Sequence, residues 1–288
     1  MKNRLQQLLT LKPIRFIADI VHLYFHKHVS RSAAGLAYFL ILTFFPILIC
    51  VTAFAGMVNV QLSDLLYDLS HLLPESVYGV FQDYLGYLDN NLSTAMLFTG
   101  STLAVFFASA AIRGLTAIMH EFYGGPRVRP VIRIAASLLF ALLLLVTVYL
   151  AMVVMLTGEW FFRSVGNALG LSDLALRFHF WQWAKYLVLL CPLFLFIFLL
   201  YRFASPARSP RPPVIPGALL ASAALAIASA VFSLAVSHST RYSLIYGSLA
   251  SVIVLLVWLY LCGNILILGN VVNYVIFCRR DGRGISTA

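Results

Sequence analysis

The chain has 288 residues, of which 61% are hydrophobic and only 10% are charged, and its formal net charge is +10. A soluble domain carries about 25% charged residues because its surface faces water. The composition, with a mean hydropathy of +0.92, therefore excludes a disordered chain, a cytosolic enzyme and a disulfide-stapled secreted module. It predicts an all-α, polytopic membrane protein that forms one integral membrane domain over residues 1–288.

The N-terminal segment, residues 1–32, is expected to be cytoplasmic and to contain one amphipathic helix. Apolar residues recur there at helical spacing, while charged residues and histidines occupy the other positions. A helix of this kind lies in the plane of the membrane interface. The apolar positions that predict its buried face are Ile17, Ile20, Val21 and Tyr24.

Six stretches of the chain are predicted to cross the bilayer. A transmembrane helix needs about 20 mostly apolar residues, and the last stretch is longer than that, so it must tilt or project from the hydrocarbon. The first external connection, 58–93, is expected to hold two amphipathic helices, which either lie on or dip into the outer leaflet or cover the helix bundle, and 278–288 is expected to form a cytoplasmic tail. The predicted spans are 33–57, 94–119, 134–157, 183–203, 214–236 and 246–277.

The charges divide unequally between the two ends of these spans. The N-terminal segment, the second and fourth connections and the tail hold 15 of the 20 lysines and arginines, whereas seven of the ten carboxylates fall on the opposite side. Because cationic residues near span ends resist translocation, this division predicts that both termini lie in the cytoplasm. The same asymmetry fits two explanations, the topology rule alone or attraction to anionic lipid headgroups or an anionic substrate.

Small and polar residues form a stripe on the sixth predicted span. Ser251, Gly269 and Asn273 share one helix face, and Asn270 lies about a quarter turn away. Such a stripe faces protein or water because unpaired amides in hydrocarbon are costly. Two interpretations follow: a helix-packing seam, with the alanine-rich fifth span as partner, or the wall of a polar translocation path.

Two residues in other spans also have alternative interpretations. Arg113 is the one formal charge well inside a predicted span, and it must snorkel to the interface, pair, or line a wet cavity where it contacts an anion. His120 follows seven residues later and can share its face. Pro46 frees a backbone carbonyl and kinks the first span, which makes it either a hinge or a packing bend.

Three stretches of sequence form longer motifs. They are SAAGLAYFLILTFFPILI at 32–49, YRFASP at 201–206 followed by PGA at 216–218, and YGSLASVIVLLVWLYLCGNILILGNVVN at 246–273. Together they resemble the YihY/BrkB family of bacterial inner-membrane proteins, formerly labelled ribonuclease BN. The resemblance implies a fold and a location in the inner membrane. Where many relatives read GAELN, this chain reads GNVVN, so Val271 occupies the carboxylate position and a mechanism based on that acid does not transfer.

The residue types available do not favour the ribonuclease label. RNA cleavage needs positioned acid and base groups or a metal cluster on the side of the membrane where RNA lies. The predicted cytoplasmic face offers Asp19, Glu121 and Asp281, in three separate segments, and no carboxylate completes a metal site with His22 and His26. We therefore expect no catalytic site, metal, cofactor or nucleic-acid partner.

The leading functional hypothesis is transport of a lipid-like or small anionic solute, along a path that includes Arg113, Ser251, Gly269, Asn270 and Asn273. The alternative is a non-catalytic factor for envelope assembly or integrity, in which the stripe is a seam between helices or between copies of the chain. A second alternative is a lipid-headgroup enzyme that uses the acidic external loop. In each case the expected partners are membrane lipids, anionic on the cytoplasmic side.

Overall fold

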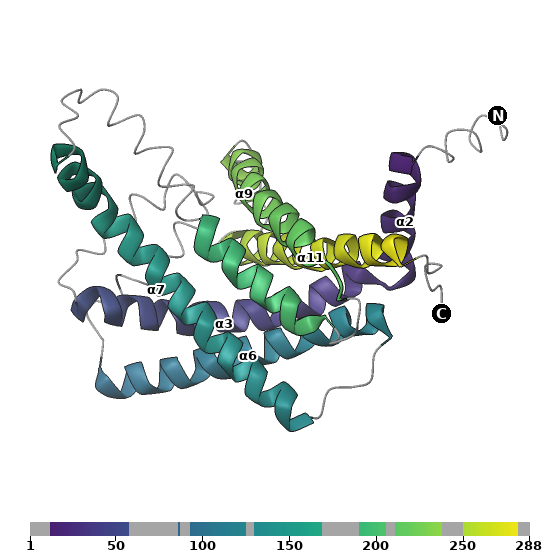
Figure 1. The fold of residues 1–288 in the computed structure, drawn as a ribbon. Helices are drawn as coiled ribbons and strands as arrows, with labels where there is room; N and C mark the ends of the chain where they lie inside the picture. The colour runs from purple at the N-terminus through teal and green to yellow at the C-terminus, as the bar shows by residue number, and fades with distance from the viewer. Residues whose placement is uncertain are drawn as a thin grey trace.

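The computed structural model describes residues 12–57, 86, 93–124, 130–168, 190–205, 211–237 and 250–281. This part of the chain is helical and has no strand, as predicted (Figure 1). A further helix, Leu190–Ala204, lies between α7 and α9 in the sequence. The other helices are α2 (Lys12–His26), α3 (Val29–Met57), α6 (Thr94–Tyr123), α7 (Pro130–Ala168), α9 (Ile215–Ser237) and α11 (Ala250–Arg280).

Five helices in the described ranges are long and apolar enough to cross a membrane, so the chain is a multi-pass membrane protein. The predicted span 183–203 is represented by the shorter helix Leu190–Ala204, and its first residues lie outside the described part. The predicted external loop 58–93 also lies outside it, except for Gly86 and Ser93. The stretches long and apolar enough to span are Val29–Cys50, Ala95–Tyr123, Val131–Leu150, Ile215–Phe232 and Val252–Arg280.

Four helices extend several residues beyond the predicted boundaries. α3 begins at Val29 instead of Ala33, α6 continues to Tyr123 instead of Met119, and α11 continues to Arg280, inside the predicted tail. α7 begins at Pro130 and ends at Ala168 instead of at residue 157, because the less hydrophobic stretch that starts at Gly158 holds no proline, and each of its two glycines costs a helix only about 1 kcal/mol. Loss of hydrophobicity marks the end of a span, therefore, but not the end of its helix.

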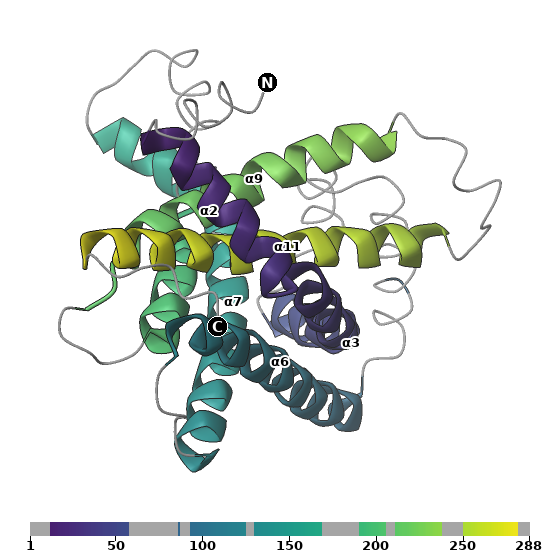
Figure 2. The same ribbon diagram turned by 90° about the vertical axis from the view of Figure 1, so that its right-hand side faces the viewer.

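The bundle is built on two neighbouring helices, α3 and α6, which lie side by side in both views (Figures 1 and 2). α7 packs against α6, while α11 crosses α3 and packs against α9. Much of the outer surface of α7 and α9 is apolar and exposed, as a lipid-facing surface must be. The core holds Leu23, Met119, Ile197, Leu200, Tyr201, Ile267 and Val271.

Both ends of α6 are fixed by local capping. At its start the Ser93 side chain accepts a hydrogen bond from the backbone N–H of Met96. At its end Gly124 adopts a left-handed conformation, with φ of 55°, which glycine reaches without a steric penalty. The chain then turns back into α7, so that α6 and α7 are neighbours joined by a short connection.

α2 is tied to the other end of the chain. The Asp19 carboxylate pairs with the Arg279 guanidinium at 2.7 Å, and this guanidinium also lies over the Phe16 ring, 5.1 Å from its centroid. The Tyr24 hydroxyl donates to the Asn264 side-chain oxygen at 3.0 Å. Burial raises the pKa of Tyr24, so the phenol keeps the proton that it donates. α2 therefore runs across α11 and not along α3 (Figure 2).

The apolar residues of α2 face two directions, which corrects the prediction of a single apolar face. Ile20 and Tyr24 pack against the core, whereas Ile17, Val21 and Phe25 are 60%, 48% and 70% exposed. The two sets differ because α11 covers only one side of α2. One apolar stripe of α2 thus packs against the rest of the protein, and a second apolar stripe remains exposed on the surface.

Candidate functional site

Arg113 lies between α6 and α7, where its side chain is half-buried. Its Nη1 donates to Ser109 Oγ at 2.6 Å and to Ser137 Oγ at 3.3 Å, and these two hydroxyl oxygens lie 2.8 Å apart. Ser109 is one turn closer to the start of α6, so the guanidinium is directed away from the nearer helix end at Tyr123. This geometry favours an intramembrane role for Arg113 over snorkelling toward that end.

A second arginine joins this site. Arg133 lies on α7, and its Nη2 donates to the backbone carbonyl oxygen of Arg113 at 2.8 Å. In the described part of the chain, no carboxylate contacts either guanidinium. The α6–α7 interface thus holds two positive charges that are hydrogen-bonded to neutral oxygens alone.

We define the α6–α7 site as Arg113, Arg133, Ser109 and Ser137. His120 lies two turns further along α6, where its ring is partly buried and its buried Nε2 atom has no hydrogen-bond partner within the described residues. The two arginines offer guanidinium N–H donors, which is chemistry suited to holding an anion.

The polar stripe of α11 has a different environment. Asn273 is fully buried, its Oδ1 accepts from the backbone N–H of Gly217 at 2.7 Å, and its Nδ2 donates to the Val214 carbonyl at 3.3 Å. It therefore caps the start of α9 from a neighbouring helix. Gly269 lies against the backbone of Gly217 and the Ala221 side chain. Both residues form a helix-packing seam with α9, the partner predicted for them.

The remaining predicted site residues are not gathered around Arg113. Asn270 is buried, and its Oδ1 accepts from the Tyr123 hydroxyl at 3.4 Å while its Nδ2 has no partner. The side chain of Ser251 lies outside the described part. Pro46 is buried inside α3, which continues through it to Met57. No hydrogen bond in the described ranges joins Arg113 to α11.

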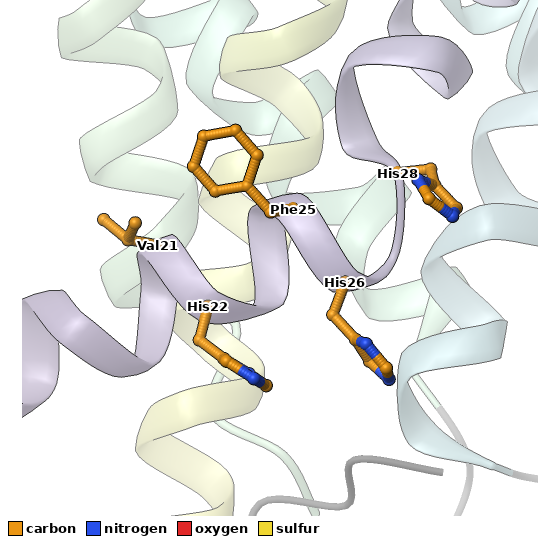
Figure 3. A pocket seen from close by; sticks show the side chains of 5 residues that line it. All are labelled: Val21, His22, Phe25, His26 and His28. Carbon is orange, nitrogen blue, oxygen red and sulfur yellow. The ribbon is translucent and has the colours of Figure 1, made fainter.

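Three histidines gather near the end of α2 (Figure 3). His22 and His26 stack with ring centroids 5.6 Å apart and point away from Val21 and Phe25. An exposed hollow of about 530 Å³ is lined by Val21, His22, Phe25, His26 and His28. The described residues contain no group of three histidine, cysteine, aspartate or glutamate side chains that could hold a metal ion.

Replacing Asn273 by alanine is expected to destabilise the protein by about 1–3 kcal/mol, because it leaves the Gly217 N–H and the Val214 carbonyl unpaired in a buried position. The measurement is the midpoint of thermal unfolding of the purified protein in detergent. Thr102→Ala is the control, since the Thr102 hydroxyl is exposed and bonds only its own helix. Equal midpoints for the two variants would contradict the capping role.

Comparison with known proteins gives relatives over nearly the whole chain. The putative ribonuclease-like protein YfkH of Bacillus subtilis is 29% identical over 258 residues, which cover 88% of this chain and 92% of the relative. A UPF0761 membrane protein of Coxiella burnetii is 27% identical over 280 residues, covering 91% and 94% of the two chains. No solved structure matches.

The family model described as Virulence factor BrkB matches residues 20–286, and this range includes every element of the α6–α7 site and of the α9–α11 seam. It also contains the three motifs on which the resemblance rests. The chain therefore belongs to the BrkB family of membrane proteins.

Proposed function

We propose that this protein moves a lipid-like or small anionic solute across the bilayer. The observation that carries the proposal is the half-buried Arg113, which meets two hydroxyls and, in the described part of the chain, no carboxylate. A charge at this depth is costly in a membrane, and ionisable residues inside spans typically mark the path of a substrate or ion. An anion that passes Arg113 would supply the missing counter-charge.

The contacts of the polar residues favour one location for this path. Gly269 and Asn273 are occupied by packing against α9, so they are unsuited to line an open passage. Arg113 instead lies on the side of α6 that faces α7. We therefore place the proposed path at the α6–α7 interface and not along the stripe of α11.

The proposed orientation is N-in and C-in, in a bacterial inner membrane. The Asp19–Arg279 ion pair supports it, because it holds the N-terminal helix and the end of α11 together. Arg15, Arg31 and Arg280 are exposed at the same end of the chain's fold and would face anionic headgroups of the inner leaflet.

In this orientation α2 lies on the inner surface of the membrane with Ile17, Val21 and Phe25 in the lipid. A spin label on Phe25→Cys is expected to collide more often with membrane-dissolved oxygen than with a water-soluble nickel complex. The same label on His26→Cys, about 100° round the helix from Phe25 and pointing away from it (Figure 3), should show a weaker preference for oxygen over the nickel complex. Both variants require a background in which the four native cysteines are replaced. Equal accessibility at the two positions would contradict an interfacial α2.

The transport proposal is tested with the purified protein reconstituted into lipid vesicles. We expect it to accelerate either the exchange of fluorescent anionic lipids between leaflets or the efflux of small anions, relative to vesicles without protein. The panel should include phosphate, chloride, short organic acids and lipids of several headgroups. No acceleration of any of these, with protein that is folded and inserted, would overturn the proposal.

A second function, that of a non-catalytic envelope assembly or integrity factor, is favoured by a separate observation. Residues of the α11 stripe serve packing, since Asn273 caps α9 and Gly269 permits close helix contact. A protein whose role is to hold contacts with lipids or partner proteins needs such rigid seams and no mobile path. In that case the charge on Arg113 would be dispensable.

A further inference from the structure

We propose that the α6–α7 site binds a phosphate group through Arg113 and Arg133. The inference deepens the proposed function and rests on it for its role in transport, because it names the chemical class of the anion and the residues that hold it. Of these two arginines, only Arg113 stands out in the sequence.

Both guanidinium groups keep N–H donors that the described part of the protein does not use. A guanidinium carries five N–H donors. Within the described residues, Arg113 commits one nitrogen to the two serine hydroxyls, and Arg133 commits one to a backbone carbonyl. Each arginine therefore keeps N–H groups for a ligand with several acceptor oxygens, and the planar guanidinium matches the spacing of phosphate oxygens.

The positive charge of the α6–α7 interface is not balanced by a carboxylate within the described residues. Two arginines lie at this interface, and among the described residues no carboxylate contacts either of them; like charges in a medium of low dielectric constant repel each other. Glu121 is exposed and makes no ion pair with them in the described structure. An anion bound between the guanidinium groups would remove this repulsion, which a neutral ligand would not.

The surroundings of Arg133 indicate how the ligand arrives. Val131, Ile132 and Ile134 are 76%, 52% and 49% exposed, so the start of α7 presents apolar side chains to the lipid. Basic sites between transmembrane helices near the cytoplasmic surface bind lipid headgroups. The phosphate can thus belong to an anionic lipid, whose chains lie along α7, or to a free phosphate ion, and the chemistry at the arginines is the same.

The test measures binding by the purified full chain in a neutral detergent, with two probes: inorganic phosphate and a short-chain phosphatidic acid. We expect at least one probe to bind, and we expect Arg133→Gln to weaken that binding by about tenfold or more. Arg133→Lys, which keeps the charge but loses the bidentate geometry, should bind with intermediate strength. Arg211→Gln is the matched control, because Arg211 is an exposed arginine outside α6 and α7.

Binding of both probes assigns the site to the phosphate group itself, and binding of phosphatidic acid alone assigns it to a lipid headgroup. Absence of binding by either probe, or equal weakening by Arg133→Gln and Arg211→Gln, would overturn the inference. If Arg133→Gln fails to fold, the comparison of Arg133→Lys with wild type decides, and equal affinities would count against the site. Arginine-dependent binding without flux in vesicles would contradict transport alone, whereas flux without such binding would contradict the phosphate site alone.

Discussion

Replacing either Gly217 or Gly269 by alanine is expected to prevent normal packing of α9 on α11. A Cβ atom at position 217 would overlap the Gly269 carbonyl oxygen and lie 2.5 Å from the Asn273 side-chain amide. A Cβ atom at position 269 would overlap the Tyr201 hydroxyl and lie 2.9 Å from the Gly217 carbonyl oxygen. Backbone atoms of packed helices cannot move aside as a flexible side chain can, so the helices must separate.

Separation would also break the Asn273 cap and the hydrogen bond from the Tyr201 hydroxyl to the Leu266 carbonyl, 2.6 Å long. We therefore expect each variant to lose at least about 3 kcal/mol of stability, the upper part of the range for overpacked sites. The measurement is the yield of monodisperse protein in detergent and its thermal unfolding midpoint.

Gly35→Ala and Gly114→Ala provide matched controls in α3 and α6. No atom lies within 4 Å of a Cβ added at either position. Because alanine is the better helix former by about 1 kcal/mol, these variants should be as stable as wild type or more stable. A Gly217→Ala protein that unfolds at the same temperature as Gly35→Ala would show that the seam tolerates the extra atom.

Hydrophobic patterning predicts most of the fold, since long apolar stretches in a chain of this composition have few alternatives to membrane-spanning helices. The close contact of the fifth and sixth spans was predicted from small residues, and Gly269 against Ala221 confirms it. Patterning does not reveal which side of a helix the protein itself covers. Tyr24 is partly buried against α11 while Phe25 beside it is exposed, and this difference comes from tertiary packing alone.

The candidate site was predicted in part. Arg113 is conspicuous because it interrupts an apolar stretch, but Arg133 was missed because it lies beside a predicted loop. A signal was present: Arg133 is the fourth residue of α7, which follows α6 after a short connection, so its long side chain can reach the preceding helix.

Replacing Arg113 by glutamine is expected to abolish most transport while leaving the fold intact. Glutamine retains an amide that can donate to the Ser109 and Ser137 hydroxyls, so the α6–α7 contact should persist. The positive charge is lost, and with it a charge-assisted hydrogen bond to the passing anion. Such a bond contributes about 1.5–3 kcal/mol, which corresponds to a loss of about tenfold to a hundredfold in the rate of flux.

The same variant separates the two proposed functions, because they demand opposite outcomes. For transport, Arg113→Gln must lose flux in vesicles, Arg113→Lys must retain part of it, and Arg211→Gln must behave as wild type. For an assembly factor, Arg113→Gln at normal protein level must restore cellular function in a strain that lacks the protein. Full restoration together with unchanged flux would leave Arg113 without a role in transport. Loss of both, with the protein folded and inserted, would tie the function of this membrane protein to the charge between α6 and α7.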